Sequence, residues 1–416
     1  MSSPSHTPHI FDLTHDQLRQ WCQSVGMPPF RARQIHEWVY SKGIADPALM
    51  SNLSKRDREL LADPDHGLAF LSGRTVAHQK ASDGTQKLLI EWDERPPRIS
   101  DLRPTSQTPA STTLPILPTA PGSTPHAPGP PQTECVMIPY GEEVFATMGK
   151  QAPDDVKERR TACISSQVGC PVGCRFCASG IGGLDGNLTA GRIVEQVWRL
   201  QQLPGVGRIT NVVFMGMGEP LANFANVARA IRTLNTPPPH GLGISARKIT
   251  VSTVGLPKAI EKLAAELDLP VTLALSLHAP NDTLRRELIP WAQYTTIPDL
   301  LSACQKWFEK TGREITLEYI LLGGVNDRPE HARELARIAR TLRANLNLIR
   351  YNEVAGMPFS RPEDAAVREF QRILRDSGVN THIRASRGRD IAAACGQLRH
   401  EKSDSPLRAR PAFSTP

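Results

Sequence analysis

The segment CPVGCRFC, residues 170–177, places Cys170, Cys174 and Cys177 in one short loop that also contains proline and glycine. A β-rich run, TACISS at residues 161–166, precedes it directly. The chain has eight cysteines in total. Thiols grouped this closely in a reducing compartment indicate metal ligation more than disulfide bonding. The loop is therefore a candidate metal centre at the end of a strand.

The loop offers three thiolate ligands, and this number bears on which metal it holds. A structural zinc site usually has four ligands, often as two separated C-x2-C pairs, and the sequence has no second pair. Three thiolates on a 4Fe–4S cluster would leave one iron open to a substrate or cofactor. A zinc ion with a distant fourth ligand, or three unrelated thiols, remains the alternative.

From Cys163 to Leu398 short β-rich runs alternate with amphipathic helical runs, which is typical of a parallel sheet with crossover helices. The expected strands are TACISS, NVVFMG, KITVST, VTLALSLH, EITLEYILL, LNLIRYN and THIRAS. The expected helices include TAGRIVEQVWRLQQL, with Thr189 as N-cap, and PEHARELARIARTL. This pattern predicts an α/β fold, a partial (β/α) barrel, with its active site at the carboxyl edge of the strands.

The rest of the chain divides by composition. Two helical runs that each stop at glycine predict a small helical domain over residues 11–75, and a hairpin turning at Asp83-Gly84 follows over 76–95. Proline-, serine- and threonine-rich sequence marks an insertion or linker at 96–133. The core is expected over residues 134–398. Residues 1–10 are expected to be a disordered N-terminus and 399–416 a flexible tail.

The 416 residues carry 49 Lys and Arg against 42 Asp and Glu, a net charge of +7. This basic excess permits a nucleic-acid partner. No stretch has the length of a transmembrane helix, and the N-terminus lacks the features of a secretory signal, so we expect a cytoplasmic protein without a membrane partner. The sequence has no exposed heptad repeat that would predict a coiled-coil partner, and we therefore expect a monomer.

The C-x3-C-x2-C spacing, with Phe176 before the last cysteine, resembles the radical S-adenosylmethionine (SAM) superfamily. The motifs around it resemble the RlmN/Cfr family of RNA adenosine methyltransferases, from about Phe11 to Leu398 and excluding the proline-rich insertion. These motifs are CISSQVGCPVGCRFCASG, FMGMGEPLAN, ITVSTVG, ALSLHAPND, YILLGGVND and SRGRDIAAACGQL. The resemblance implies a radical SAM core with an accessory RNA-binding domain at residues 11–75.

The resemblance also implies roles for individual residues. Cys170, Cys174 and Cys177 match ligands of a 4Fe–4S cluster. The positions that match SAM contacts are Gly218, Glu219, Ser252, Ser276, Leu277, His278 and Asn352. Taken singly, each of these is an ordinary strand-end residue. Together, at the ends of successive strands, they form a plausible pocket wall.

Three further residues match the family's catalytic positions. Cys395 matches the cysteine that carries the methyl group, Cys163 the second redox cysteine, and Glu134 the carboxylate that removes a proton from the target carbon. The implied chemistry uses two SAM molecules per turnover and needs an electron donor such as a flavodoxin system. Taken alone, Cys395 is a buried structural cysteine in an apolar helix, whereas Cys22, Cys135 and Cys304 match no role.

The implied substrate is an adenosine of 23S rRNA, methylated at C2, with tRNA as a second substrate class. Methylation at C8, the Cfr type, stays open. So does a divergent paralogue with another RNA target, or a non-catalytic iron–sulfur or RNA-binding protein that has lost activity. Arg384, Arg387 and Arg389 lie close to Cys395 in sequence and are candidate RNA contacts.

The chain departs from the family pattern in three places. The gap between Glu134 and Cys163 is longer than in the family. Leu184 and Gly186 stand where the family usually has phenylalanine and arginine. Glu353 follows the YN pair where the family often has proline.

Overall fold

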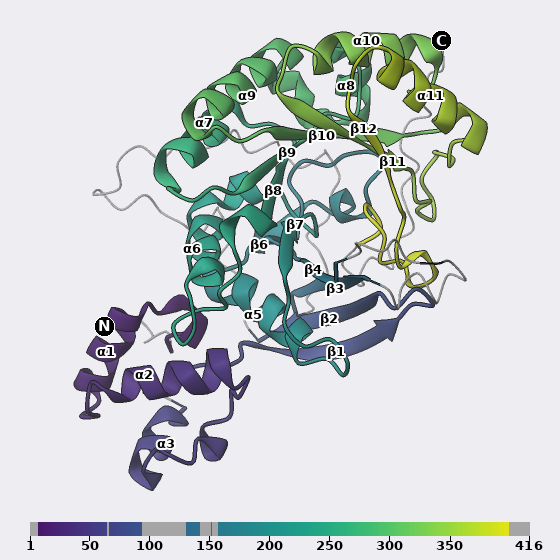
Figure 1. Ribbon diagram of the computed structural model, residues 1–416. Coiled ribbons are helices and arrows are strands. Elements are labelled where there is room, and N and C mark those ends of the chain that lie inside the picture. Colours follow the sequence, from purple (N-terminus) through teal and green to yellow (C-terminus); the bar gives the residue numbers. More distant parts are fainter. Residues whose placement is uncertain (1–6, 65, 94–129, 142–150, 152–156, 399–416) are drawn as a thin grey trace.

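The computed structural model describes residues 7–64, 66–93, 130–141, 151 and 157–398. Most of the expected disordered N-terminus, nearly all of the proline-rich segment 96–133 and almost the whole tail 399–416 lie outside the described residues. The described chain forms a large mixed sheet with helices packed outside it, and a helical lobe at the N-terminal end (Figure 1).

Seven strands of the ten-stranded sheet run parallel, in the chain order that the alternation of runs predicts. They are β4 (Arg159–Cys163), β7 (Asn211–Phe214), β8 (Ile249–Thr253), β9 (Thr272–Ser276), β10 (Ile315–Leu321), β11 (Ala344–Arg350) and β12 (Thr381–Arg384). All seven predicted strands are confirmed. Among the described residues β12 pairs only with β11, so the barrel is partial.

Three antiparallel strands extend the sheet beyond β4. The strands β1 (Gly73–Lys80) and β2 (Gln86–Trp92) form the predicted hairpin, and β3 (Gln132–Tyr140) pairs with both β2 and β4. Because β3 begins at Gln132, the linker predicted over 96–133 extends slightly too far. The proline-rich composition ends at Pro131, and the strand starts at the next residue.

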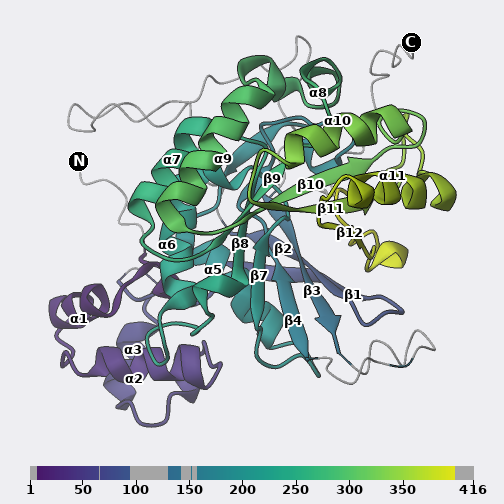
Figure 2. The ribbon, with the colours of Figure 1, turned by 45° about the horizontal axis from the view of Figure 1, so that its top comes forward.

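The crossover helices cover the outer face of the sheet (Figure 2). They are α5 (Ala190–Gln201), α6 (Phe224–Asn235), α7 (Pro257–Glu266), α8 (Asp282–Leu288), α9 (Ile297–Thr311), α10 (Pro329–Ala339) and α11 (Asp364–Asp376). Short helical turns lie between them at η5 (Ala178–Gly180), η6 (Pro220–Asn223), η7 (Ala246–Lys248), η8 (Pro290–Tyr294) and η9 (Arg389–Ile391). Thr189 caps α5 as predicted, because its side chain accepts the N–H of Arg192 at 3.2 Å.

The N-terminal lobe consists of short helical elements. They are η1 (Ile10–Asp12), α1 (His15–Ser24), α2 (Arg31–His36), the π-helical turn η2 (Glu37–Ser41), η3 (Pro47–Leu49) and α3 (Lys55–Leu61). The predicted glycine stops are present, since Gly26 and Gly43 have φ of 71° and 67°, in the left-handed region that glycine adopts without strain. No helix in the described part of the chain is long and apolar enough to cross a bilayer.

The segment after β12 crosses from the last strand of the sheet to the first hairpin. The Gly388 N–H donates to Asp83 at 3.0 Å, and the Ser82 N–H donates to Asp390 at 2.9 Å. These bonds connect the two ends of the open sheet without strand pairing. Consequently residues 385–398 lie across the carboxyl edge of the parallel strands.

A buried carboxylate joins the N-terminal lobe to the core. Glu195 on α5 is fully buried and accepts hydrogen bonds from His9 at 3.0 Å, from the N–H and hydroxyl of Ser72, and from Arg199 at 2.8 Å. Burial alone would raise the pKa of Glu195, but the hydrogen bond and charge of His9, with Arg199 and Ser72, lower it. The folded state therefore favours the ionised carboxylate.

We expect Glu195→Ala to lower the free energy of unfolding by about 3–5 kcal/mol, because the largely buried Arg199 loses its counter-charge. Glu261→Ala, which breaks an exposed ion pair with Lys306, should cost less than about 1 kcal/mol. Chemical denaturation of both variants measures the difference.

The depressed pKa also sets the pH dependence. The contribution of Glu195 is present above its ordinary pKa of 4.5 and is lost as pH falls through the lower folded-state value. The difference in the free energy of unfolding between wild type and Glu195→Ala should thus become smaller in acid. A gap that stays constant between neutral and acidic pH would contradict this assignment.

Candidate functional site

The cysteine loop is held by a small two-stranded sheet, β5 (Gln167–Gly169) and β6 (Leu184–Asn187). The Cys170 N–H donates to the Gly183 carbonyl at 2.8 Å, and the Arg175 N–H donates to the Leu288 carbonyl at 3.0 Å. Gly169 has φ of 77°, and a Cβ there would collide with the backbone of Gly183. Backbone bonds at both ends of the loop thus fix where its three thiols lie.

The number of thiols in the loop bears on which metal it can hold. Cys170, Cys174 and Cys177 influence one another's protonation, so they lie near one another. A structural zinc ion usually takes four protein ligands, whereas a 4Fe–4S cluster held by three thiolates would leave one iron open. Three thiols therefore fit such a cluster better than a structural zinc ion.

The electrostatics of the loop also suit an anionic metal cluster. Burial raises the pKa of all three thiols, that of Cys170 to about 12, so the thiolates need a metal to replace their protons. Arg285 is fully buried near Cys174. Burial lowers the pKa of Arg285 to about 10, although the charge of a Cys174 thiolate favours the charged guanidinium. Its Nη1 has no hydrogen-bond partner among the described residues. A buried cation with an unpaired N–H beside the thiols fits a negatively charged group there.

The turn after β7 places Gly218 and Glu219 next to β5. Gly218 has φ of 102°, and a Cβ there would lie 2.7 Å from the side chains of Ser166 and Gln167, so only glycine fits. The Glu219 carboxylate accepts the N–H groups of Leu221 at 3.0 Å and Val254 at 2.8 Å. Burial raises the pKa of Glu219 to about 7 despite these bonds. This carboxylate ties the ends of β7 and β8 together.

The other predicted SAM contacts lie at successive strand ends. Ser252 donates to the Phe214 carbonyl at 2.6 Å, whereas Ser276 is half-buried at the end of β9. The Leu277 side chain is fully buried in the core. His278 has φ of 59°, which is strained for a residue with a Cβ, and its ring packs edge-on against Phe176 at 5.1 Å. Its strained backbone is fixed beside the cysteine loop.

The protonation state of His278 follows from its partners. The ring Nδ1 accepts the N–H of Ile320 at 3.1 Å, so the neutral ring carries its proton on Nε2. Burial, with Arg285, lowers the pKa of His278 to about 3. The ring is therefore neutral at physiological pH.

Cys395 is brought to the cysteine loop by hydrogen bonds to its neighbours. The Ala178 N–H donates to the Gly396 carbonyl at 2.8 Å, and Ser179 donates to the Leu398 carbonyl at 2.6 Å. The Asn352 amide donates to the carbonyl of Cys395 itself at 3.2 Å. The side chain predicted to contact SAM therefore positions the candidate methyl carrier.

Cys163 ends β4 on the same side of the sheet. Its side chain belongs to a small apolar cluster with Val136, Met217, Ala393 and Leu398. Burial and, after it, the charge of a Cys395 thiolate raise the pKa of Cys163 to about 12, so the two thiols are close enough to interact. The structure thus brings together two cysteines that are distant in sequence.

Arg384 and Glu318 lie beside this cysteine pair. Arg384 Nη1 lies 3.8 Å from Glu318 Oε2 and 3.3 Å from the sulfur of Met215, and Asn347 donates to Glu318 Oε1 at 3.0 Å. Burial raises the pKa of Cys395, Arg384 lowers it and Glu318 raises it. Arg384, a sequence candidate for RNA contact, is instead directed inward at a buried carboxylate.

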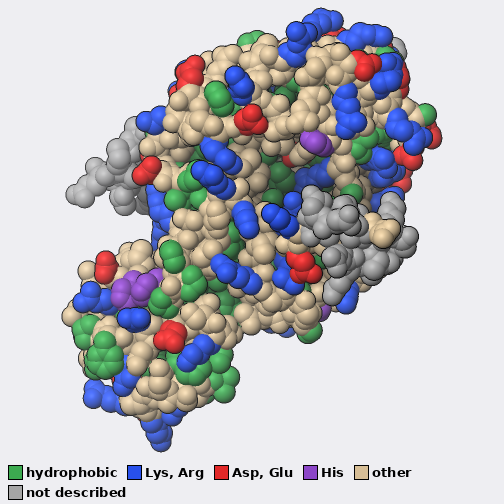
Figure 3. Space-filling model, in the orientation of Figure 1, with side chains coloured by type: hydrophobic (Ala, Val, Ile, Leu, Met, Phe, Trp, Pro, Cys, Tyr) green, Lys and Arg blue, Asp and Glu red, His purple; other side chains and the backbone are tan. Residues whose placement is uncertain are grey.

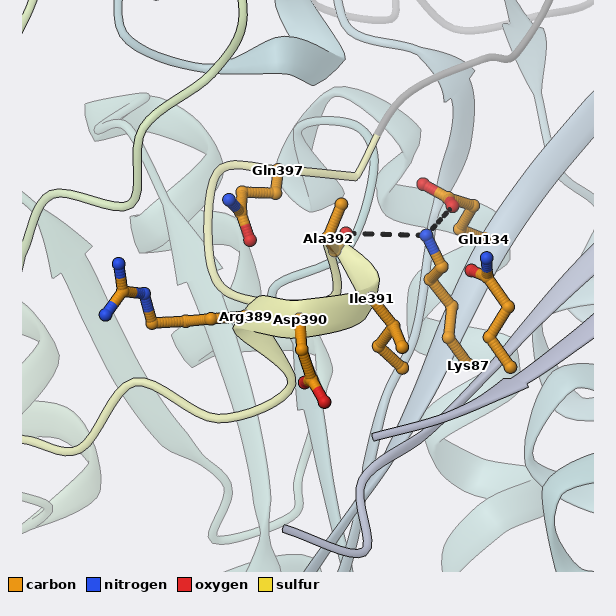
Figure 4. A pocket seen from close by; sticks show the side chains of 8 residues that line it. Lys87, Glu134, Arg389, Asp390, Ile391, Ala392 and Gln397 are labelled. Atoms are coloured by element: carbon orange, nitrogen blue, oxygen red, sulfur yellow. Dashed lines mark hydrogen bonds and ion pairs between the residues drawn. The ribbon is translucent and has the colours of Figure 1, made fainter. Parts of the chain in front are cut away.

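Glu134 is buried on β3 and forms an ion pair with Lys87 of β2, at 2.6 Å. Figure 4 shows Lys87 directed both at this carboxylate and at the Ala392 carbonyl, which it reaches at 3.4 Å. These residues line a cavity of about 360 Å³ together with Gln79, Arg389, Asp390, Ile391 and Gln397. The cavity separates the hairpin extension from the loop that carries Cys395.

The longer sequence between Glu134 and Cys163 does not separate their strands, because Val136 pairs with Cys163. The Glu134 carbonyl accepts the Ser165 hydroxyl at 2.6 Å. Leu184 and Gly186 lie on β6, next to the cysteine loop, and the Glu353 carbonyl accepts the amide of Gln397 at 3.0 Å. Leu184, Gly186 and Glu353 thus border the site.

Sequence reasoning missed Lys87, Arg285 and Glu318. The available signal was weak. Glu318 is the inner of two glutamates in the apolar strand EITLEYILL, and Lys87 shares the strand QKLLIEW with Glu91. A charge in a strand that is otherwise buried needs a partner, but the sequence does not name that partner.

Comparison with known proteins gives consistent matches. Residues 9–64 match the "Ribosomal RNA large subunit methyltransferase N-terminal domain" family and residues 164–336 the "Radical SAM superfamily". A protein of Rhodopirellula baltica named "Probable dual-specificity RNA methyltransferase RlmN" is 41% identical over 397 residues, 95% of this chain and 92% of its own length. A protein of the same name from Gloeobacter violaceus is 40% identical, over 94% of this chain and 95% of its own length.

A solved structure matches over almost the same extent. The crystal structure of a radical SAM methyltransferase from Sphaerobacter thermophilus superimposes with a TM-score of 0.77 at 37% identity. The match covers 94% of this chain and 99% of that one. The partial barrel and the N-terminal lobe are therefore both parts of a known architecture.

The charges around Cys395 should control its reactivity in opposite directions. Removing the cation in Arg384→Met raises the thiol pKa, so alkylation of Cys395 by iodoacetamide at pH 8 should slow roughly tenfold. Glu318→Gln removes an anion and should speed the same reaction. Peptide mass spectrometry of cluster-loaded protein measures labelling at Cys395 against pH.

Arg384→Lys, which keeps the charge, is the matched control and should stay near wild type. If Arg384→Met and Glu318→Gln shifted the pH profile of Cys395 labelling in the same direction, the effect would be structural and not electrostatic.

Proposed function

The chain belongs to the RlmN family of radical SAM RNA methyltransferases, and we propose that it methylates C2 of an adenosine in 23S rRNA and in tRNA through an S-methyl group on Cys395. The relatives' name "dual-specificity RNA methyltransferase" supports two substrate classes. The name of the family that matches residues 9–64 supports ribosomal RNA of the large subunit as one of them.

One observation carries the proposal. The loop of Cys395 is hydrogen-bonded to the residues that follow Cys177, through Ala178 and Ser179, while Cys163 packs against Ala393 and Leu398. A cysteine placed between a metal-binding loop and a second thiol suits a group carrier that must afterwards be released. A purely structural cysteine would not require either neighbour.

The cofactors fit the residues at the strand ends. Cys170, Cys174 and Cys177 would hold a 4Fe–4S cluster, and the wall that includes Gly218, His278 and the other strand-end residues would face SAM. When bound, the cluster and SAM supply the methyl group and the radical chemistry. Two SAM molecules per turnover belong to this proposal.

The protein's own residues stabilise the thiolate of the methyl carrier and release the product from it. Cys395 must be a thiolate to accept a methyl group, and the charge of Arg384 favours that form against burial. In the release step, Cys163 attacks the sulfur of Cys395. A new S–S bond forms as the S–CH2 bond to RNA breaks. The RNA carbon keeps the bonding pair and takes up a proton, which completes the methyl group. A cellular thiol reductant then reduces the disulfide.

Glu134 is the proposed base that takes the proton from the target carbon. Its buried ion pair with Lys87 favours the ionised carboxylate, which is the form a base requires. The adjacent cavity of about 360 Å³ lies within the range of small-molecule sites. It would receive an adenine base turned out of a structured RNA loop.

The remaining parts of the proposal concern partners. The helical lobe would bind RNA as the family's accessory domain over residues 11–75, with residues 134–398 as the catalytic core. An electron donor such as a flavodoxin system would reduce the cluster. The enzyme would act as a cytoplasmic monomer.

Nucleoside mass spectrometry tests the reaction directly. The reconstituted protein is incubated anaerobically with rRNA or tRNA, SAM and reductant, and the products are compared with standards. We expect 2-methyladenosine from both RNA classes. An 8-methyl product would assign the Cfr type instead, and neither product, despite SAM cleavage, would mean that Leu184, Gly186 and Glu353 mark another substrate.

Substituting Cys395 and substituting Cys163 should block the reaction at different steps. Cys395→Ala removes the methyl carrier and should abolish product, whereas Cys163→Ala should leave the RNA bound covalently through Cys395, visible as a shifted band on a denaturing gel. Cys304→Ala, a buried cysteine on α9, is the control and should stay active. Turnover of free product by either site variant would overturn the mechanism.

Glu134 and Lys87 form the third test. Glu134→Gln should lower the rate of product formation by about 10²–10⁴, the usual contribution of a general base. Lys87→Met removes the cation that pairs with Glu134. The carboxylate should then ionise less readily, so the activity of this variant should recover as pH increases. An activity profile in Lys87→Met that is parallel to wild type at every pH would rule out this role.

A further inference from the structure

Three histidines meet where the N-terminal lobe contacts the core. His15 is the first residue of α1, His36 ends α2, and His240 lies in the loop between α6 and η7. Figure 3 shows histidine side chains gathered on the lobe, at its border with the rest of the molecule. This group lies outside the radical SAM site, and the proposed reaction does not use it.

The nitrogens of this group have the spacing of metal ligands. One nitrogen from each ring lies within 4.8 Å of the other two. Nδ1 of His36 and Nδ1 of His240 are 3.3 Å apart. Two nitrogens bound to one tetrahedral zinc at about 2.0–2.1 Å would be separated by roughly 3.3 Å. The closest pair thus needs almost no movement to share an ion.

Two nitrogens of the group lack partners. Nδ1 of His15 and Nε2 of His36 are buried without a hydrogen bond to any described residue. Leaving such a group unpaired costs about 1–3 kcal/mol. The described residues also place no carboxylate in an ion pair with these three rings. His36 faces His240 through Nδ1 and not through its unpaired Nε2, so the unpaired atom that a shared ligand could satisfy is Nδ1 of His15.

Each histidine is held by a fixed backbone. His15 follows Thr14, which forms a capping box with Gln17. The loop of His240 is closed by a hydrogen bond from the His240 N–H to Pro237 at 3.1 Å and from the Gly243 N–H to Thr236 at 2.9 Å. His36 is fully buried at the junction of α2 and η2. Such preorganisation reduces the cost of assembling a metal site.

We propose that His15, His36 and His240 bind one zinc ion, with a water molecule as the fourth ligand. Imidazole is a preferred ligand of zinc, and three histidines with an open fourth position are an established coordination set. Because two ligands come from the lobe and one from the core, the ion would fix the lobe relative to the catalytic domain.

Zinc content of the cluster-loaded, full-length protein tests this site. The cysteines are then occupied by iron, so zinc is not taken up by them. After incubation with zinc chloride and gel filtration, elemental analysis should find about one zinc per chain, the stoichiometry of a three-histidine site. His240→Gln and His15→Gln, both partly exposed, should lose most of it.

His66→Gln is the matched control, because His66 is exposed on the same lobe and outside the group; it should retain zinc. Zinc should also raise the melting temperature of wild type and not that of His240→Gln. Equal retention in all variants, or none in wild type, would overturn the proposal.

X-ray absorption at the zinc edge of the wild-type protein identifies the atoms bound to zinc, so it tests the site even if a variant fails to fold. Nitrogen and oxygen neighbours support the site, and sulfur neighbours contradict it. RNA methylation by the same preparations is measured separately, so failure of this inference is distinguishable from failure of the proposed reaction.

Discussion

The hydrogen bonds from Asn352 to the Cys395 carbonyl and from Ala178 to the Gly396 carbonyl determine where Cys395, the proposed methyl carrier, lies. Cys395 is far in sequence from Cys163 and from the cysteine loop, so only fixed backbone contacts can bring it to both. The contacts of Asp83 and Asp390 between the hairpin and residues 388–390 hold the other end of the same segment. Without this crossing segment the parallel sheet would carry the candidate metal loop but not the proposed methyl carrier.

Burial has two opposing consequences in this site. It excludes water from the site, and this exclusion protects reactive intermediates of the proposed radical reaction. It also raises the pKa of every thiol that the proposed reaction has to deprotonate. The cations Arg285 and Arg384 oppose the second effect, near Cys174 and near Cys395 respectively. Groups on the strands or at strand ends hold both arginines in place. Arg285 donates to the Leu277 and Val254 carbonyls, and Arg384 faces the Glu318 carboxylate. The sheet therefore supplies both the scaffold and the compensating charge.

The parallel strands, the hairpin turn and the Thr189 cap could be predicted because each depends on a local pattern: alternating runs, a turn pair and a hydroxyl before a helix. The inward direction of Arg384 could not, since it depends on Glu318, which lies on a strand that is distant in sequence. The Lys87–Glu134 pair spans the proline-rich insertion, and the histidine group joins two separate parts of the chain. Motif resemblance proposed site residues, but only the three-dimensional structure indicates that Asn352 positions Cys395.

The closeness of Cys163 and Cys395 is the central claim, and disulfide mapping tests it most directly. Cluster-loaded protein is oxidised briefly with diamide under anaerobic conditions, digested without reduction and analysed by mass spectrometry. The structure predicts a peptide pair linked through Cys163 and Cys395, with Cys22 and Cys304 recovered as thiols. Cys135 also interacts with Cys163. A dominant Cys135–Cys163 link, or no link to Cys395, would contradict the account.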